Sequence, residues 1–120
     1  MLSATGANLG LLGFSEASLN KHFGSRGKSD HSEQYPGMTR EQYAKRALDL
    51  AQSSVAGEIR GYGAVNGRYK GSIVRYDTAT NDWLRVTPNG RIVTMFKPDD
   101  GVEYFESIGR IERRGDLDGD

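Results

Sequence analysis

The hydrophobic pattern of the chain changes period once, near residue 55, and this change determines the expected fold class. In residues 39–54, Tyr43, Ala44 and Ala47 fall on one face at helical spacing. After residue 58 apolar and polar residues alternate, as in half-buried strands, through GSIVRYD, DWLRVTP and RIVTMFKP. Helices followed by strands predict an α+β domain, with N-terminal helices on one face of a central antiparallel sheet.

Capping residues predict where the helices begin. Ser15 precedes EASLNKHF and caps a first short helix. Thr39 with Gln42 is a capping box, and the helix it starts is expected to end near residues 53–54. DGVEYFESIGRIERR has helical spacing and predicts a short C-terminal helix. The expected parts are a helical part (15–54), an antiparallel sheet (58–98), a C-terminal helix (99–112) and an acidic tail (113–120).

The length and composition exclude several classes of protein. The 120 residues fit one domain, so residues 1–120 are expected to form a single unit. There is no cysteine, which excludes thiolate catalysis and cysteine zinc sites, and two histidines make a histidine-rich metal site unexpected. No metal or cofactor is therefore expected. MLSATGANLGLLGF lacks the pattern of a signal peptide, and no apolar run is long enough to span a membrane.

Charge is unevenly distributed although the net charge is zero. Residues 60–97 contain seven basic and two acidic residues, whereas residues 98–120 contain eight acidic and three basic residues. A basic middle followed by an acidic tail is typical of a protein with a nucleic-acid partner. Solvated faces explain the same asymmetry equally well.

Two Asn-Gly pairs predict turns of the sheet. Asn66-Gly67 predicts a two-residue hairpin. Asn89-Gly90 joins the last two strands and pairs residues whose numbers sum to 179, so that Thr94 faces Arg85.

The turn between the second and third strands decides where Arg75 lies. A three-residue loop, with Asn81 in the left-handed region, places Arg75 opposite Arg85 and forms a row with Thr94. A four-residue loop sends Arg75 to the other face. Asparagine tolerates positive φ, which favours the three-residue loop. Two facing arginines destabilise a sheet unless an anion lies between them, so the row predicts an anion pocket, with a phosphodiester as the natural ligand. The alternative is that both guanidiniums lie along a solvated face.

Four segments carry a family resemblance: LNKHF, MTREQYAKRALDL, SIVRYDTATNDWLRV and RIVTMFKPDDGVEYF. Together they resemble the C-terminal tRNase toxin domains of CdiA proteins, which act in contact-dependent growth inhibition and belong to the barnase/EndoU/colicin/RelE group of ribonucleases. The resemblance runs over residues 19–105, and its strongest pieces are RYD-x-x-TN and TMFKP.

The resemblance implies an activity and its partners. The activity is metal-independent cleavage of tRNA, in which the ribose 2′-OH attacks the adjacent phosphate and leaves a 2′,3′-cyclic phosphate. The expected partners are the tRNA and a cognate immunity protein; no DNA and no membrane insertion by this domain are expected, and a host protein activator is left open. The domain would belong to a larger secreted or cell-surface toxin that is delivered into the target-cell cytoplasm.

The resemblance also implies the catalytic residues. His22 matches the family's His-Phe, Arg75 its RYD arginine, and Thr94 and Lys97 its TMFKP. Relatives carry a second histidine where this chain has Arg26, so His31 or a tyrosine would have to replace it.

The roles follow from the chemistry of phosphodiester cleavage. His22 suits acid–base exchange near neutral pH. Arg75 and Lys97 would stabilise the pentacoordinate phosphate, and Thr94 would bind a phosphate oxygen or the 2′-OH, unless it is only a good strand former. The expected RNA-binding residues are Arg26, Lys28, Arg68 and Arg85, the last being equally compatible with a plain surface residue.

Other polar and aromatic residues have open interpretations. His31 lies in a glycine- and serine-rich loop and is expected to be exposed to solvent rather than catalytic. Tyr69, Tyr76 and Trp83 either stack bases or pack within the sheet. Tyr104 and Phe105 are expected in the core.

Two other functions remain as alternatives. One is an NAD-dependent ADP-ribosyltransferase toxin, which needs a glutamate acting on the ribose; Glu103 and Glu106 fall in a predicted helix, which counts against it. The other is a non-catalytic binding module.

Overall fold

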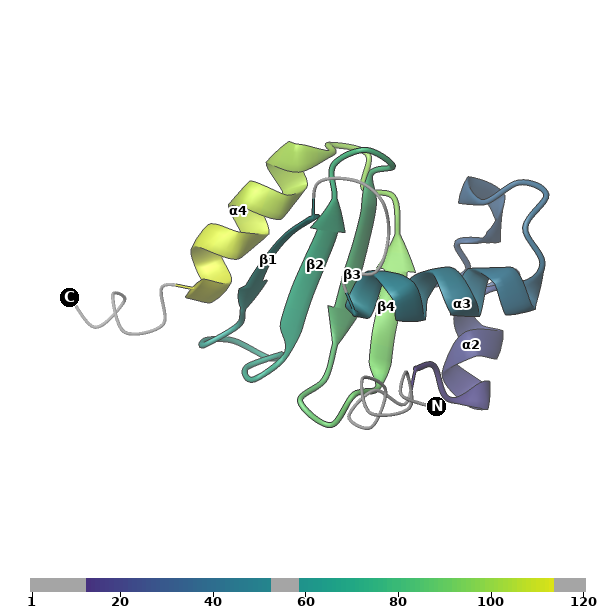
Figure 1. Cartoon of the computed structure of the whole chain (residues 1–120), viewed down its shortest axis with the longest axis horizontal. Coiled ribbons are helices and arrows are strands. Elements are labelled where there is room, and N and C mark those ends of the chain that lie inside the picture. Colours follow the sequence, from purple (N-terminus) through teal and green to yellow (C-terminus); the bar gives the residue numbers. More distant parts are fainter. Residues whose placement is uncertain (1–12, 53–58, 114–120) are drawn as a thin grey trace.

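The computed structural model describes residues 13–52 and 59–113, which form the predicted α+β fold. Four antiparallel strands lie side by side in the order β1-β2-β3-β4, each next to its neighbour in sequence (Figure 1). The elements are α2 (Glu16–His22), a 3₁₀ turn η1 (Ser32–Gln34), α3 (Arg40–Ala51), β1 (Ile59–Gly63), β2 (Ile73–Asp77), β3 (Asp82–Val86), β4 (Ile92–Phe96) and α4 (Val102–Arg113).

The predicted caps start α2 and α3. The Ser15 hydroxyl accepts a hydrogen bond from the Ser18 N–H at 3.1 Å. Thr39 and Gln42 form the complete reciprocal capping box. The end expected for the second helix, at residues 53–54, lies outside the described residues, as does the acidic tail after Arg113.

The two-residue hairpin predicted at Asn66-Gly67 is wrong. The Ala64 N–H donates to the Ser72 carbonyl at 2.9 Å and the Gly71 N–H donates to the Ala64 carbonyl at 2.8 Å, so the segment between them is a wide loop. This loop is held both by backbone hydrogen bonds of its own and by α4. The Val65 N–H donates to the Glu112 carbonyl at 2.9 Å, and the Asn66 side-chain amide donates to the Ile111 carbonyl at 2.9 Å.

The predicted three-residue loop between β2 and β3 is also wrong, and the error moves Arg75. Asn81 does adopt positive φ (64°), but the turn contains four residues and is closed by Asp77 opposite Asp82. The Asn81 N–H donates to the Asp77 carbonyl at 2.8 Å, which fixes this longer turn. Arg75 therefore faces Leu84, on the sheet face opposite to Arg85.

The predicted pairing of Arg85 with Thr94 is confirmed. A bulge follows between Arg85 and Val86, where Val86 pairs with Ile92. Ile92 is two residues before Thr94, so strict alternation would place both side chains on the same face of the sheet. The bulge instead places Ile92 on the opposite face, which packs against α3.

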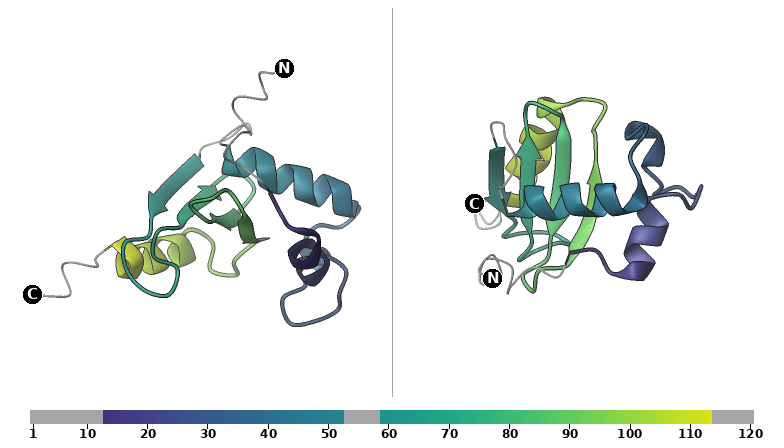
Figure 2. Two further views of the ribbon diagram at one scale, coloured as in Figure 1. Left: turned by 90° about the horizontal axis from the view of Figure 1, so that it is seen from below. Right: turned by 45° about the vertical axis from the view of Figure 1, so that its right-hand side comes forward.

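Helices cover both faces of the sheet, with α3 on one side and α4 on the other (Figure 2). The α3 side buries Leu84, Val86, Ile92 and Met95 against Tyr43, Ala47 and Leu50. The α4 side buries Tyr62, Val74, Tyr76, Trp83 and Phe105. The N-terminal helix α3 therefore covers one face as predicted, and the C-terminal helix α4 packs on the other face, over β1 to β3.

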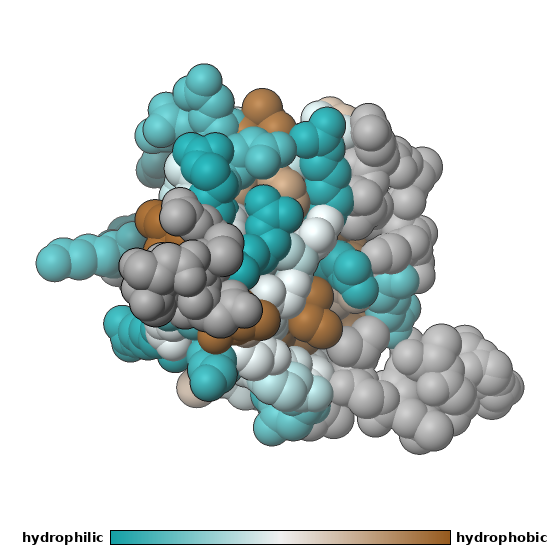
Figure 3. All heavy atoms as spheres, turned by 90° about the vertical axis from the view of Figure 1, so that its left-hand side faces the viewer, coloured by the Kyte–Doolittle hydropathy of each residue, from teal (hydrophilic) through white to brown (hydrophobic). Residues whose placement is uncertain are grey.

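The outer surface beside α4 is mostly hydrophilic, with separate apolar side chains (Figure 3). Val65, Val102 and Ile111 are exposed, at 51%, 42% and 61%. What remains open on this side of the sheet is the part beyond α4, along β4, and this is where the candidate site lies.

Candidate active site

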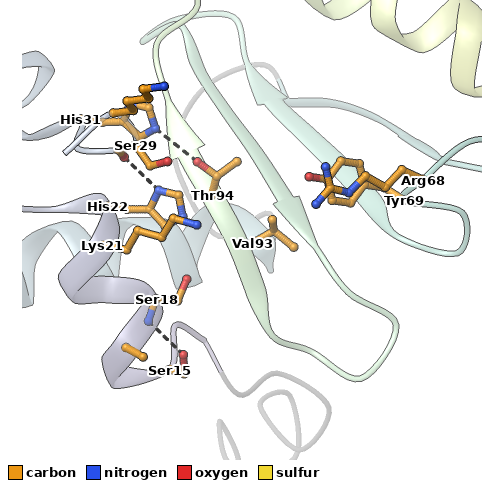
Figure 4. A pocket seen from close by; sticks show the side chains of 12 residues that line it. Ser15, Ser18, Lys21, His22, Ser29, His31, Arg68, Tyr69, Val93 and Thr94 are labelled. Atoms are coloured by element: carbon orange, nitrogen blue, oxygen red, sulfur yellow. Dashed lines mark hydrogen bonds between the residues drawn. The ribbon is translucent and has the colours of Figure 1, made fainter.

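A concave surface of about 720 Å³ lies between α2, the loop before η1, β4 and the β1–β2 loop. We call it the histidine cleft. Figure 4 shows the two histidines and Thr94 close together, with Arg68 and Tyr69 on the opposite side. Its polar and charged lining includes Lys21, His22, Lys28, His31, Arg68 and Thr94.

His22 is the last residue of α2 and is buried by the same helix face as Leu19, three residues earlier. Its Nδ1 lies 3.0 Å from the Ser29 carbonyl oxygen. Burial is the main cause that lowers the pKa of His22, and Lys21 lowers it further, whereas the Ser29 and Val93 carbonyls raise it. Because carbonyl oxygens accept hydrogen bonds from the N–H groups of the ring, they favour the imidazolium over the neutral form.

The loop after α2 is organised by one carboxylate. Asp30 accepts hydrogen bonds from the backbone N–H groups of Gly24, Arg26 and Ser32. These three hydrogen bonds hold the pKa of Asp30 well below its usual range. The loop is thus drawn around Asp30, and the next residue, His31, is turned back toward α2: its N–H donates to the His22 carbonyl at 2.8 Å.

His31 stacks on His22, with ring centroids 5.6 Å apart and an interplanar angle of 10°. Its other side stacks on Phe96, with centroids 5.2 Å apart. Its Nε2 lies 3.5 Å from the Thr94 hydroxyl oxygen. The expectation that His31 is a solvent-exposed loop residue is therefore wrong: it is half-buried at the floor of the cleft.

The two rings influence each other's protonation. Burial lowers the pKa of His31, and the neighbouring His22 lowers it again, while Asp30 raises it. A proton on His22 therefore opposes a proton on His31. Since two carbonyls favour protonated His22, the first proton is expected there.

Three cations line the same cleft as this pair and come from three separate segments: Lys21 from α2, Lys28 from the following loop and Arg68 from the β1–β2 loop. Among the described residues that line the cleft, none is an aspartate or a glutamate. Two of the four predicted RNA-binding residues, Lys28 and Arg68, thus line the cleft. Arg26 lines a separate depression with Asp30 and Glu33.

Arg85 neither lies on the surface nor is free to bind RNA, which corrects both interpretations of it. It is 4% exposed, and its guanidinium makes two hydrogen bonds to the Glu112 carboxylate, at 2.8 and 3.1 Å. A third, at 2.8 Å, goes to the Ser72 hydroxyl. Tyr62 also donates to Glu112, at 2.8 Å. The arginine joins α4 to the sheet beneath the cleft.

Arg75 is separated from the cleft by the sheet itself. It pairs with Leu84 and so lies on the face opposite to Thr94. Within the described part of the chain its Nε is buried without a hydrogen-bond partner, and a Cβ added at Gly61 would lie 3.1 Å from its guanidinium. The predicted row of Arg75, Arg85 and Thr94 does not form.

Lys97 belongs to a second polar cluster, at the far end of the sheet. Its ammonium donates to the Asp82 carboxylate and to the Thr80 carbonyl, each at 2.9 Å. Arg46 binds Asp82 at 2.7 Å and Asp77 at 2.8 Å, which compensates two carboxylates that are almost fully buried. Of the predicted catalytic residues, only His22 and Thr94 are brought together.

The aromatic residues divide clearly. Tyr76 and Trp83 are buried on the α4 side and cannot stack on a ligand, whereas Tyr69 is 36% exposed in the cleft wall. Phe105 is in the core as predicted, and Tyr104 packs against the same cluster. The two candidate glutamates of an ADP-ribosyltransferase, Glu103 and Glu106, lie on α4 and line a different depression.

The sequence indicates His31 only as one possible replacement for the second histidine and otherwise predicts it to be exposed, and it does not single out Lys21. One local signal for His31 exists: Asp30 followed two residues later by Ser32 is an Asx-turn pattern, which predicts an ordered loop. No local signal reports that this loop folds back onto β4.

Two further properties concern the described residues alone. No group of three or more His, Asp or Glu side chains among them is arranged to hold a metal ion. None of their helices is long and apolar enough to cross a membrane.

Comparisons with known proteins give no family for this chain. No protein-family model matches it, and a search of curated proteins finds no significant match.

Proposed function

We propose that the chain is a metal-independent endoribonuclease whose active site is the histidine cleft. The observation that carries the proposal is the stacked pair of His22 and His31 beside Thr94, with three cations and no carboxylate among the described lining residues. Phosphodiester cleavage by a neighbouring 2′-OH needs a base, an acid and positive charge, and these residues supply all three.

The roles follow from the protonation of the pair. His31, kept neutral by its protonated neighbour, accepts the proton of the 2′-OH. The 2′-oxygen attacks phosphorus, the bond to the 5′-oxygen breaks, and His22 in its imidazolium form donates a proton to that oxygen. The products are a 2′,3′-cyclic phosphate and a 5′-hydroxyl. Thr94 binds a phosphate oxygen, and Lys21 and Lys28 balance the charge that develops on the phosphate.

The mechanism requires a pair that carries one proton. Because the pKa of each histidine is lowered, this half-protonated form is most populated below pH 6.5, the reference value for a free histidine. We therefore expect kcat/KM to be bell-shaped with its maximum in mildly acidic solution, and to fall at pH 8 because His22 loses the proton that it must donate.

The biological setting is proposed from the resemblance of the LNKHF, RYD and TMFKP segments to CdiA toxin domains. On that basis the substrate is tRNA, the domain is delivered into the cytoplasm of a target bacterium, and a cognate immunity protein covers the cleft. Of the catalytic residues that the resemblance implied, the proposal keeps His22 and Thr94, and His31 takes the place of the second histidine.

The test is incubation of the purified protein with total bacterial tRNA at pH 6, with and without EDTA. We expect discrete fragments that end in a 2′,3′-cyclic phosphate and are unaffected by EDTA. His31→Asn is expected to lose at least 100-fold in rate, since one acid–base group contributes about 10²–10⁴-fold. Full activity of this variant, or fragments that require a divalent metal, would contradict the proposal. Intact tRNA would favour the alternative of a non-catalytic binding module.

A further inference from the structure

Tyr69 lies in the wall of the histidine cleft, across from the two histidines (Figure 4). It is one of the few large apolar side chains that the described residues leave exposed, at 36%. An exposed aromatic ring next to a cluster of cations is the arrangement that single-stranded nucleic-acid sites use to hold a base.

The ring of Tyr69 is fixed from behind by a buried cation. The guanidinium carbon of Arg85 lies 4.3 Å from the ring centroid. Arg85 is itself held by two hydrogen bonds to Glu112 and one to Ser72. A tyrosine on a surface loop ordinarily samples several rotamers, whereas this one rests on a side chain that cannot move without breaking a buried ion pair.

The loop that carries Tyr69 is also anchored. Besides the bonds from Val65 and Asn66 to the end of α4, the Ser72 N–H donates to the Tyr69 carbonyl at 2.9 Å. Gly67 and Gly71 take positive φ (87° and 93°), which lets the loop turn twice within its length. The aromatic platform is therefore ordered before any ligand binds, and little entropy is lost on stacking.

The neighbouring Arg68 completes the arrangement. Its guanidinium carbon lies over the Tyr69 ring, 5.3 Å from the centroid, and this exposed side chain lines the same cleft. A base that stacks on the tyrosine would take the place of this guanidinium and bring its own phosphate near it. A flat ring and a cation in one wall, and acid–base groups in the other, match one nucleotide held beside the bond that is cut.

We propose that Tyr69 stacks on a nucleobase next to the cleaved bond, so that the substrate is single-stranded RNA or an unpaired loop. This inference rests on the proposed ribonuclease function. A base within a duplex is stacked on both faces and cannot reach the ring, whereas an unpaired base can. Every base has a flat face, so this contact selects for unpaired structure and tolerates any base.

The test is binding of a single-stranded 2′-O-methyl RNA of about nine nucleotides, which cannot be cleaved because it lacks the 2′-OH. Tyr69→Phe is the matched control, because it keeps the ring. We expect Tyr69→Ala to weaken binding by about 5- to 100-fold, and Tyr69→Phe to stay within about threefold. The same RNA annealed to its complement should bind the wild type more weakly than the single strand and should be insensitive to Tyr69→Ala.

A comparison of intact and abasic RNAs distinguishes stacking by Tyr69 from a purely structural role of this residue. Each position is made abasic in turn, and the one that most weakens wild-type binding marks the stacked base. On that abasic RNA, Tyr69→Ala should weaken binding less than about twofold further, because the contact is already lost. An equal loss on the intact and abasic RNAs would overturn the inference, since it would mean that the substitution merely disturbs the loop.

Failure of this inference can be told apart from failure of the proposed function. If the protein cleaves RNA but Tyr69→Ala binds the uncleavable strand as the wild type does, stacking is refuted and the ribonuclease stands. If binding depends on Tyr69 but no RNA is cleaved, the ribonuclease is refuted and the stacking site stands. If the wild type does not bind the single strand, stacking is refuted whatever the cleavage assay shows.

Discussion

Removing one partner of the buried ion pair between Arg85 and Glu112 should destabilise the protein far more than removing one partner of an exposed ion pair. The Arg85 Nη2 lies 2.8 Å from the Glu112 Oε2, and the two side chains are 5% and 12% exposed. Breaking a buried pair from one side costs about 3–5 kcal/mol, because the remaining charge stays out of water. Glu112 is also in the last turn of α4, where a negative charge is unfavourable by about 0.3–1 kcal/mol. The expected loss for Glu112→Gln is therefore about 2–4 kcal/mol.

The chain offers a matched control in Arg60 and Glu106, which also join a strand to α4. Their side chains are 44% and 43% exposed, and the Arg60 Nη1 lies 3.2 Å from the Glu106 Oε2. Glu106→Gln should therefore lower the free energy of unfolding by at most about 1 kcal/mol. Urea unfolding of both variants gives the two free energies, and the Tm of Glu112→Gln should fall by at least about 8 °C. The double variant Arg85→Met with Glu112→Leu should be more stable than Glu112→Gln, because no charge is left unpaired. Equal losses for the two glutamine variants would mean that burial adds nothing to the cost of removing one partner of the Arg85–Glu112 pair.

Three further predictions concern the polar clusters and the cleft. Lys97→Met should lower the free energy of unfolding by about 1–3 kcal/mol, since Asp82 loses one charged partner. Its kcat/KM for RNA should change less than about threefold in the folded protein. A large loss of activity without a loss of stability would instead indicate that Lys97 belongs to the active site. Folding lowers the pKa of both histidines below the value of about 6.5 that they have in the unfolded chain, so the unfolded chain takes up protons first as the pH falls. The urea concentration at the midpoint of unfolding should therefore fall as the pH is lowered below about 6.5, and then level off. His31→Gln should reduce this pH dependence, and a midpoint that rises toward acid pH would contradict the prediction. Lys28→Ala should lower by about 0.7 the slope of the logarithm of RNA affinity against the logarithm of salt concentration, as expected for one lost phosphate contact on a single strand, and an unchanged slope would place Lys28 away from the RNA.

Local chemistry made much of the fold predictable. Ser15 and Thr39 fix the starts of α2 and α3 through hydrogen bonds within three residues, so the signal is complete in the sequence. The predicted pairing of Arg85 with Thr94 is also found, but the loop before β4 is closed by Thr87 and Arg91 and is one residue longer than the predicted turn; the bulge beside Val86 compensates for the difference. The pairing predicted across the turn before β3 is wrong, although Asn81 has the predicted positive φ. A difference of one residue in loop length is decided by hydrogen bonds to Asp77, and it reverses the face of every residue in β2.

The candidate site was less predictable, because tertiary contacts assemble it. His22 and Thr94 were found from a resemblance, whereas Arg75 and Lys97, chosen in the same way, lie elsewhere. The register of β2 places Arg75 on the face of the sheet opposite to the cleft, and Lys97 forms an ion pair with the buried carboxylate of Asp82. The burial of His31 was not predicted, because its place depends on a loop folded around Asp30 and on stacking across to β4, neither of which leaves a periodic pattern in the sequence.

The most direct test of the account compares His31→Asn with Arg75→Met on the same tRNA, with EDTA present, at pH 6. Both variants are first shown to be folded by their urea transitions. The histidine cleft predicts that His31→Asn loses at least about 100-fold in kcat/KM, whereas Arg75→Met, on the other face of the sheet, stays within about threefold of the wild type. The reverse result, with Arg75 essential and His31 dispensable, would contradict the assignment of the active site to the cleft.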